Sequence, residues 1–442
     1  MTGPMSNLEI GLASFPALLL LIFIRVPIGL AMFLVGLVGL YFTTGSFNLP
    51  LARLKSETFS TFSSYSLSIV PMFLLMGHFA TLGGMSSALF KAAESFLGHR
   101  KGGIAMAAIG ACAGFGAICG SSLATAATMG RVALPELRKY GYSGGFSTAT
   151  LAAGGTLGIL IPPSIVLVIY AILTEQNIAK LFLAAFIPGI FAAVGYVIAI
   201  SIYVRLHPEA AGVKAAVPYA ERFAALFKVW PVLLVFALVV GGIYQGWFTP
   251  TEGAAVGAAG TGFIAWMNKG LTRSTLIESF LVTAKSSAMI FFIILGAGFY
   301  NGFLALTQVP QEISNFVVNQ GFSPWVVLSI ILLFYLVFGC LMDSLSMILL
   351  TVPIFFPVIV ELDFGMSQEH IAIWFGILVL IVVEVGLITP PVGMNLFVIN
   401  AMDRSTPLVQ TYKVVMYFVA SDIARVILLV AFPAITLFWL RS

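Results

Sequence analysis

Apolar segments of about twenty residues recur along nearly the whole chain, and they restrict its fold more than any other feature. A helix of that length spans the roughly 30 Å of hydrocarbon in a bilayer. Inside a membrane only helices and closed barrels satisfy every backbone hydrogen bond, and these segments lack the alternation that barrel strands need. Hydrophobic residues make up 60% of the 442 residues and charged residues only 9%. The sequence therefore predicts an all-α polytopic membrane protein.

The basic residues gather in three parts of the chain, namely residues 91–139, the polar linker of residues 205–228, and residues 269–285. Because cytoplasmic loops carry an excess of lysine and arginine, these parts are predicted to be cytoplasmic. The acidic segment from Glu361 to His370 is then outside, and both chain termini are predicted to be periplasmic. This bias also accounts for the net charge of +4, so no nucleic-acid partner is predicted.

Two apolar segments contain a pair of adjacent prolines, which a continuous helix does not tolerate. Pro162 and Pro163 interrupt GILIPPSIVLVIYAI, and Pro390 and Pro391 interrupt GLITPPVGMNLFVIN. A proline lacks the backbone donor and clashes with the preceding turn, so each pair is predicted to break its helix. We assign Pro162 and Pro390 a structural role, as the residues at which the breaks begin.

Each break follows a glycine- and serine-rich interruption in an earlier apolar segment. FGAICGSSLATAATMGRVALPEL, from Phe115, aligns with FGCLMDSLSMILLTVPIFFPVIV, from Phe338, and the alignment pairs Ser121 with Ser344. Basic residues flank the first interruption and acidic residues follow the second, so the two re-entrant hairpins should enter from opposite sides. Inverted-topology repeats of this kind are typical of secondary transporters, whose ligands bind near the midplane.

The repeats divide the chain into four predicted parts. Residues 1–62 should form N-terminal scaffold helices, and residues 205–285 a cytoplasmic arm linker, with an arm helix over 205–228, followed by further scaffold helices. The first repeat, residues 63–204, should contain a re-entrant hairpin near 102–138 and a broken helix near 144–172. The second repeat, residues 286–442, should contain a hairpin near 325–360 and a broken helix near 371–400.

The motifs GILIPPS, GLITPPVG and FTPTEGAAVG, the last beginning at Phe248, occur in an order that resembles one known family. Over nearly its entire length the chain is similar to the large, DctM-type membrane subunit of tripartite ATP-independent periplasmic (TRAP) transporters. The resemblance implies an elevator-type, sodium-coupled importer of organic acids, such as C4-dicarboxylates or sialic acids, in the bacterial inner membrane. It also implies a periplasmic substrate-binding protein and a separate small four-helix membrane subunit as partners. It implies no enzymatic activity and no cofactor, only sodium as the coupling ion.

Hydroxyl-bearing residues and glycines beside the interruptions are the candidate sodium ligands, because sodium prefers oxygen and broken helices free backbone carbonyls. Substrate is expected at the half-helix ends, since positive helix N-termini attract a carboxylate. The first sodium set is Ser121, Ser122, Thr125, Gly154, Gly155 and Gly158; the second is Asp343, Ser344, Ser346, Thr389 and Gly393; the substrate set is Ser122, Pro163, Ser164, Pro391 and Asn395.

Several candidates have a second interpretation that the sequence leaves open. Small hydroxyl residues such as Ser121 also pack membrane helices, and Asp343 serves equally well as a helix cap. Asn395 could instead hydrogen-bond a neighbouring helix. Glu252, at the start of the TPTEGAAVG helix, is predicted to be a capping or scaffold residue rather than a ligand.

Other functional classes fit the sequence less well. The chain has no HExxH motif and no aspartate pair in its apolar segments, so a membrane-embedded enzyme is not predicted. Re-entrant hairpins also build channel filters, but a pseudo-twofold repeat favours alternating access. The nearest alternative is a dicarboxylate or citrate sodium symporter that works without a binding protein.

Overall fold

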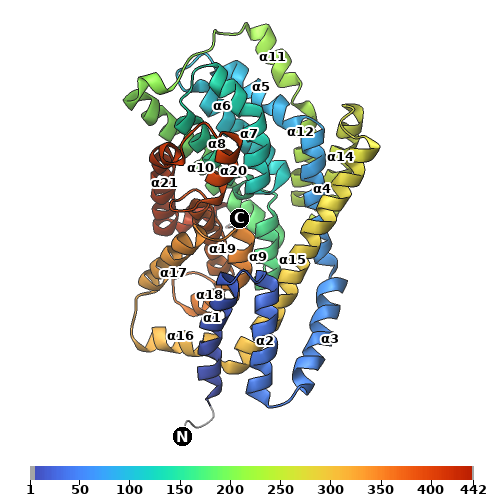
Figure 1. Ribbon diagram of the computed structural model, residues 1–442, viewed down its shortest axis with the longest axis vertical. Helices are drawn as coiled ribbons and strands as arrows, with labels where there is room; N and C mark the ends of the chain where they lie inside the picture. Colours follow the sequence, from blue (N-terminus) through green and yellow to red (C-terminus); the bar gives the residue numbers. More distant parts are fainter. Residues whose placement is uncertain (1–4, 441–442) are drawn as a thin grey trace.

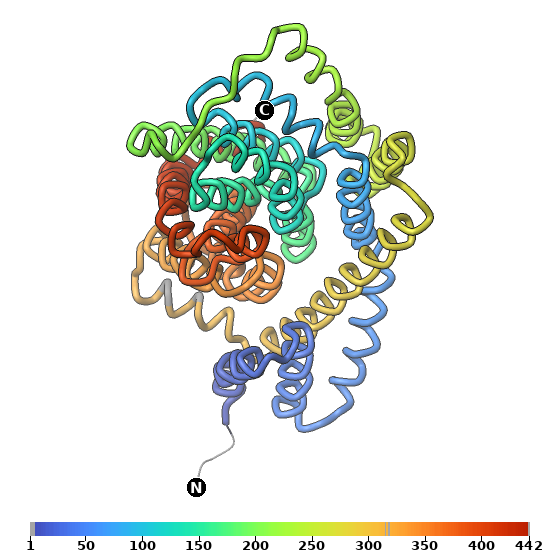
Figure 2. Tube along the Cα trace, turned by 45° about the horizontal axis from the view of Figure 1, so that its top comes forward, coloured from blue at the N-terminus to red at the C-terminus, as the bar shows by residue number. Residues whose placement is uncertain are grey.

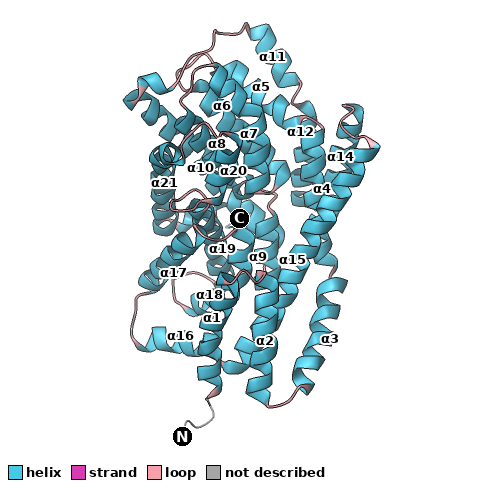
Figure 3. Cartoon of the chain, in the orientation of Figure 1, coloured by secondary structure: helices cyan, strands magenta, loops and turns pink. Residues whose placement is uncertain are grey.

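The computed structural model describes residues 5–440, apart from the side chains of residues 314, 317 and 318. The described residues fold into helices joined by loops, with no strand (Figure 3). Six helices are long and apolar enough to span a membrane, or up to eight if each of two bent pairs is one span. These findings confirm the predicted all-helical membrane protein. The six are Tyr65–Leu82, Ile178–Leu206, Arg273–Thr307, Ser344–Glu361, Gln368–Gly386 and Leu408–Ala431.

One group of helices lies along one side of the molecule, and we call it the scaffold group. Figure 2 shows it as an arc beside the more compact remainder. Its longest member, α15, packs along α2, where a β-carbon added to Gly29 would lie 2.9 Å from Cα of Ile293. Small residues permit this close approach of membrane helices. The group consists of α1 (Asn7–Phe23), α2 (Ile28–Thr44), α3 (Asn48–Ser63), α4 (Ile69–Leu82), α14 (Pro250–Met267) and α15 (Arg273–Thr307).

The first hairpin consists of α6 (Gly103–Cys119) and α7 (Ser122–Lys139). Its tip is two residues long, because Gly120 adopts a positive φ of 63° and Ser121 starts the next helix. A positive φ is easily reached only by glycine, so this residue permits the tight reversal. The broken helix that follows comprises α8 (Gly144–Leu160) and α9 (Ile165–Thr174), which are bent by 43° at the first Pro-Pro pair.

The second hairpin consists of α17 (Pro324–Gly339) and α18 (Ser344–Glu361). Its broken helix comprises α19 (Gln368–Gly386) and α20 (Met394–Met402), separated at the second Pro-Pro pair. Figure 1 shows the first hairpin in the upper half of the molecule and the second in the lower half. Past their breaks, α9 packs on α18, and α20 packs on α7 and α8. Each half-helix therefore reaches into the other half, and we call α6 to α9 with α17 to α20 the hairpin group.

The remaining helices frame these two groups. Next to the hairpin group, α10 packs against α21, and α5 packs against α6 and α11. α16 follows the scaffold helix α15 and packs against α18. The bounds are α5 (Met85–Leu97), α10 (Ile178–Leu206), α11 (Tyr219–Phe227), α12 (Trp230–Phe236), α13 (Gly242–Tyr244), α16 (Val309–Asn319), α21 (Leu408–Ala431) and α22 (Pro433–Thr436).

Three elements differ from the sequence predictions. Beyond the end of α10 at Leu206, the predicted arm is helical only at α11 and a short 3-10 turn, because Pro208, Gly212 and Pro218 interrupt it. The polar segment Asn48–Ser63 forms the additional helix α3. The predicted division between residues 285 and 286 falls inside α15, which begins at Arg273 after a Thr272 cap and continues without a break.

Candidate functional site

The tip of the first hairpin lies against the first broken helix. Ser121 is the N-cap of α7, and its Oγ accepts a 3.4 Å hydrogen bond from the Ala124 amide. A β-carbon added to Gly158 of α8 would collide with Thr125 Oγ1 and would lie 2.7 Å from the carbonyl oxygen of Ser121. The absence of a side chain at Gly158 therefore lets α8 reach the oxygens of the tip.

The other residues of the first set are only partly gathered at this tip. A β-carbon on Gly155 would lie 3.1 Å from the Ser122 carbonyl oxygen, whereas one on Gly154 would meet Cys112 of α6 instead. The Thr125 hydroxyl is buried and has no hydrogen-bond partner among the described residues. An unpaired buried hydroxyl is costly unless something else binds it, so Thr125 fits a cation ligand.

The first Pro-Pro break is buried beside the same tip. Ser164 is fully buried and caps α9, where its Oγ accepts from the Leu167 amide at 3.4 Å. The Pro163 carbonyl oxygen would lie 3.2 Å from a β-carbon on Gly120 of the tip. The structure therefore brings the sequence-predicted residues Ser121, Thr125, Gly158, Pro163 and Ser164 into one region.

At the second hairpin tip the capping residue is acidic. Asp343 is the N-cap of α18, and its Oδ2 accepts a 3.1 Å hydrogen bond from the Ser346 amide. Of the two roles that the sequence left open for Asp343, the structure shows the cap. The Ser344 hydroxyl donates to Glu384 Oε1 at 2.5 Å. The tip also meets the second break, because the Gly393 amide donates to the Cys340 carbonyl at 3.3 Å.

The second break is more open than the first. Pro391 is exposed, and its carbonyl accepts a 2.6 Å hydrogen bond from the Tyr412 hydroxyl. Thr389 donates its hydroxyl proton to the Val385 carbonyl of its own helix at 2.6 Å. Asn395 is fully buried and donates to the Ala152 carbonyl of α8 at 3.2 Å, so it does bond a neighbouring helix. Its Oδ1 has no partner among the described residues.

Sequence reasoning missed Glu384 as a member of this site. The side chain is fully buried in α19, two residues before the helix ends, and it contacts the second tip through Ser344. One signal was present in the sequence, because a single acidic residue inside a long apolar segment is a functional hypothesis by default. The partner of Glu384 lies 40 positions away, and no local pattern identifies it.

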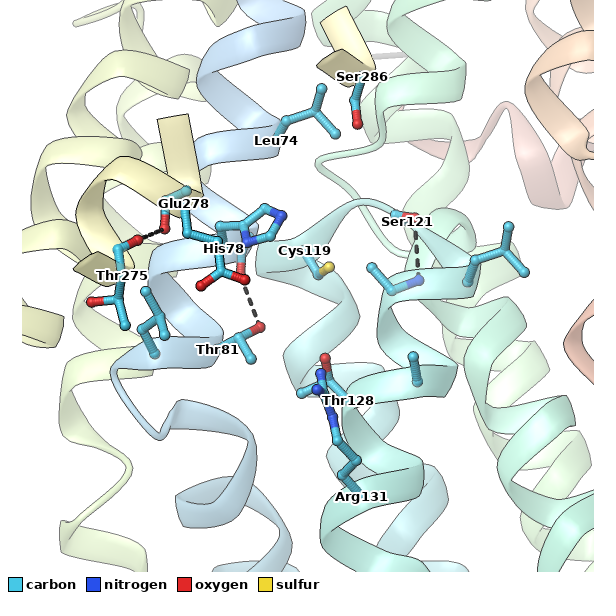
Figure 4. A pocket seen from close by; sticks show the side chains of 16 residues that line it. Leu74, His78, Thr81, Cys119, Ser121, Thr128, Arg131, Thr275, Glu278 and Ser286 are labelled. Carbon is cyan, nitrogen blue, oxygen red and sulfur yellow. Dashed lines mark hydrogen bonds between the residues drawn. The ribbon is translucent and has the colours of Figure 1, made fainter. Parts of the chain in front are cut away.

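A cavity of about 430 Å³ lies between the first hairpin and the scaffold helices α4 and α15. Figure 4 shows Ser121, Thr128 and Arg131 on the hairpin side and His78 and Glu278 on the scaffold side. Arg131 has no ion pair or hydrogen bond through its side chain within the described part of the chain. The cavity therefore offers a free guanidinium in the same space as a hairpin tip. In the sequence, Arg131 was one of the basic residues of 91–139 from which the cytoplasmic side was predicted.

Glu252 lies outside this region and caps α14. Its carboxylate accepts from the Thr249 amide at 2.8 Å, and the Thr249 hydroxyl accepts from the Glu252 amide at 3.2 Å. The reciprocal pair is a capping box, which satisfies free donors at a helix start. Glu252 is therefore a capping residue in the structure.

Sequence comparison identifies the family of the chain. Residues 15–435 match the family described as the DctM component of the tripartite ATP-independent periplasmic transporter. The chain belongs to this family. It is therefore one component of a transporter and not an enzyme, and the resemblance read from its motifs is confirmed.

Two relatives and one solved structure are similar to this DctM-type permease. It is 37% identical over 385 residues to the C4-dicarboxylate TRAP transporter large permease protein DctM of Pseudomonas aeruginosa, covering 87% of this chain and 88% of the relative. It is 31% identical to the isethionate TRAP transporter permease protein DctMQ of Oleidesulfovibrio alaskensis, covering 96% of this chain and 65% of the relative. Its fold is similar to that of the YdaH transporter of Alcanivorax borkumensis, with a TM-score of 0.62 at 12% identity over 87% of this chain and 89% of that one.

Proposed function

We propose that this permease imports an organic acid into the bacterial cell by sodium-coupled, elevator-type transport. It would work in the inner membrane with a periplasmic substrate-binding protein and a small four-helix membrane subunit. The observation that carries this proposal is the pair of hairpin tips, each seated against the backbone of its own Pro-Pro break. Broken helices expose backbone dipoles at membrane depth, where they bind ions and carboxylates.

Sodium as the coupling ion is supported by the oxygens around the first tip. The Thr125 hydroxyl has no protein partner in the described chain, and the Ser121 carbonyl lies beside Gly158. Hydroxyl and carbonyl oxygens are suitable ligands for a hard cation. The second tip offers the Ser344 hydroxyl and the Cys340 carbonyl, although this carbonyl already accepts from the Gly393 amide and Asp343 is occupied as a cap.

An organic acid as substrate is supported by the cavity beside the first tip. A carboxylate in this cavity would meet the positive N-terminus of α7 and the guanidinium of Arg131. Arginine binds carboxylates through two parallel hydrogen bonds. The two relatives described above are named for a C4-dicarboxylate and for isethionate, and both are organic anions.

An elevator motion is supported by the order and packing of the elements. α4, α5, the first hairpin, its broken helix and α10 are followed later by α15, α16, the second hairpin, its broken helix and α21. The two sets point from opposite ends of the molecule, as expected of an inverted repeat with its second copy beginning at α15 (Figure 1). Because α9 and α20 interlock the two hairpins, the hairpin group would move as one body against the scaffold group.

A glycine next to a native cysteine allows a direct test of this motion. A β-carbon on Gly77 of α4 would lie 3.3 Å from Cys119 Sγ at the first tip, so Gly77→Cys should form a disulfide between scaffold and hairpin. Oxidation should then stop uptake, and reduction should restore it. The unsubstituted chain is the control, because its three cysteines are free and its uptake should not change on oxidation. Uptake that survives a complete Gly77–Cys119 crosslink would contradict the elevator.

The partners and the orientation can be tested separately. Proteoliposomes containing both membrane subunits, a sodium gradient and the binding protein should accumulate substrate, and the large permease alone should not. Substantial uptake without a binding protein would favour the symporter alternative. Thiol labelling of cysteines introduced at Lys214 and Asp363, in a variant without native cysteines, should find the first protected and the second accessible from outside the cell. Labelling of both from one side would contradict the inverted repeat.

A further inference from the structure

Glu384 is a buried carboxylate without an evident counter-charge. Its side chain is fully buried in α19, and Oε1 accepts the Ser344 hydroxyl proton at 2.5 Å. Oε2 is also buried and has no hydrogen-bond partner among the described residues. A buried carboxylate is stable only if another group balances its charge and satisfies both of its oxygens. The second oxygen is therefore free to bind a cation or a proton.

The charged groups around α19 are already paired with one another. On α21, Arg425 donates to Asp422 at 2.7 Å, and Tyr196 of α10 donates to the other oxygen of Asp422 at 2.7 Å. The tyrosines on the remaining neighbours are also engaged, since Tyr335 of α17 bonds Thr351 and Tyr170 of α9 bonds the Ala372 carbonyl. Arg425 thus balances Asp422, and no basic side chain forms an ion pair with Glu384 within the described chain.

Both hairpin tips meet this carboxyl group. Ser344 begins α18 at the second tip, and Ser122, which begins α7 at the first tip, also lies close to Glu384. Both serines are almost completely buried. A cation placed at Oε2 would therefore find one carboxylate and two hydroxyl oxygens from three different segments. One negative charge among neutral oxygens balances a monovalent cation better than a divalent one.

We propose that Glu384 is the anionic ligand of a sodium ion held between the two hairpin tips, with the hydroxyls of Ser122 and Ser344 as neutral ligands. This site is additional to the hydroxyl and carbonyl ligands around Thr125, and it rests on the proposed sodium coupling. Because both hairpins and α19 contribute ligands, the ion would tie the halves of the hairpin group together. Sodium binding would therefore rigidify the body that moves.

Sodium-dependent thermal unfolding of the purified full chain tests the site without any need for substrate or partners. Sodium chloride is titrated against choline chloride at constant ionic strength, and the unfolding temperature is recorded for wild type, Glu384→Gln and Glu384→Asp. The Gln variant, which has no charge, should need about tenfold more sodium or more for the half-maximal shift. The Asp variant, which keeps the charge on a shorter chain, should respond between the two. Glu94→Gln is the matched control, since Glu94 is a buried glutamate paired with Lys214 at 3.2 Å.

The outcomes separate this site from the proposed function. An unchanged sodium response in Glu384→Gln overturns the site. The site is also overturned if the unfolding temperature of Glu384→Gln keeps the wild-type sodium midpoint but loses the pH dependence of wild type. The carboxyl group would then bind a proton instead of sodium. If Glu384→Gln is not monodisperse, Glu384→Asp decides alone, and a wild-type sodium midpoint in that variant counts against the site. If wild-type transport in proteoliposomes proceeds without sodium, sodium coupling itself fails, whichever way the variants behave.

Discussion

Both hairpin regions consist of a hairpin followed by a broken helix, and they differ in how tightly the break is packed. At the first break, Pro162 and Pro163 are buried, four residues separate the half-helices, and Ser164 caps the second one. At the second break the connection is longer, Pro391 is exposed, and α20 begins after Gly393, which provides no side-chain cap. The first region is a tightly packed site, and the second has more freedom to rearrange.

The two regions also differ in charge. The first tip presents neutral oxygens from Ser121, Ser122 and Thr125, whereas the second begins with the carboxylate of Asp343 and bonds Glu384 directly through Ser344. An internal repeat thus preserves the geometry that exposes backbone groups, while the side chains set the electrostatics of each copy. We expect cation binding to depend on carboxylate charge in the second region and on neutral oxygens in the first.

Adding a methyl group at closely packed glycines should have the largest effect. A β-carbon on Gly386 would meet only backbone of Gly339, at 2.5 Å, and one on Gly158 would meet Thr125 and the Ser121 carbonyl. Alanine at either position should cost about 1–3 kcal/mol of stability through overpacking and should abolish uptake. Gly110→Ala is the control, since its β-carbon would meet nothing within 4 Å. Normal uptake by Gly158→Ala would show that the first region is not tightly packed.

Removing one hydroxyl from each region should separate their roles. Ser344→Ala takes away the hydrogen bond to Glu384, so it should lower stability by about 1–3 kcal/mol and weaken sodium activation of uptake. Thr125→Val keeps the shape and removes a hydroxyl without a partner in the described protein. It should weaken sodium activation and leave stability in choline unchanged. Equal sodium midpoints in wild type and Thr125→Val would exclude Thr125 as a ligand.

The helix caps at the tips should have a moderate effect. Ser121→Ala removes the acceptor for the Ala124 amide and should cost about 0.5–2 kcal/mol, as capping substitutions do. Asp343→Asn keeps an acceptor for the Ser346 amide, so unfolding temperature should change little. A large loss of sodium activation in Asp343→Asn, with stability unchanged, would show that Asp343 binds the ion in addition to capping α18.

The smallest effect is expected where the two repeats meet at an exposed ion pair. Lys180 at the start of α10 and Glu369 at the start of α19 are 2.5 Å apart, with their side chains 45% and 49% exposed. Because solvent and salt screen such a pair, Lys180→Ala should cost no more than about 1 kcal/mol, and less at high ionic strength. A double-mutant cycle with Glu369→Ala would measure the coupling, and a large salt-independent value would contradict this expectation.

The sequence predicted best those features that depend on local chemistry. The helices after both tips begin at Ser122 and Ser344, within the predicted hairpins, because glycine and capping residues fix a helix start locally. It could not predict which segments meet across the fold. The bond between Ser344 and Glu384 and the contact between Asn395 and α8 depend on tertiary packing.

Continuous helices with charged faces were also hidden from sequence reasoning. α15 carries Arg273, Glu278 and Lys285 in its first half, and these charges looked like a polar linker because they precede the apolar segment. In the structure the same residues lie on one uninterrupted helix, with Glu278 facing the cavity. A run of charged residues therefore does not by itself indicate a loop, because these residues can lie on the side of a helix that water reaches.

The length of α15 indicates where the cavity lies relative to the hydrocarbon layer of the bilayer. Its apolar residues 286–307 rise about 33 Å, close to the roughly 30 Å of bilayer hydrocarbon, and the charged residues 273–285 add about 20 Å beyond it. The cavity wall includes Thr275, Glu278 and Ser286, so it lies where the apolar part of this helix begins. We expect lipids with shorter chains to place more of that wall in the headgroup layer, and transport measured across a series of chain lengths would show it. Membrane thickness would then regulate how readily water and ions enter the permease.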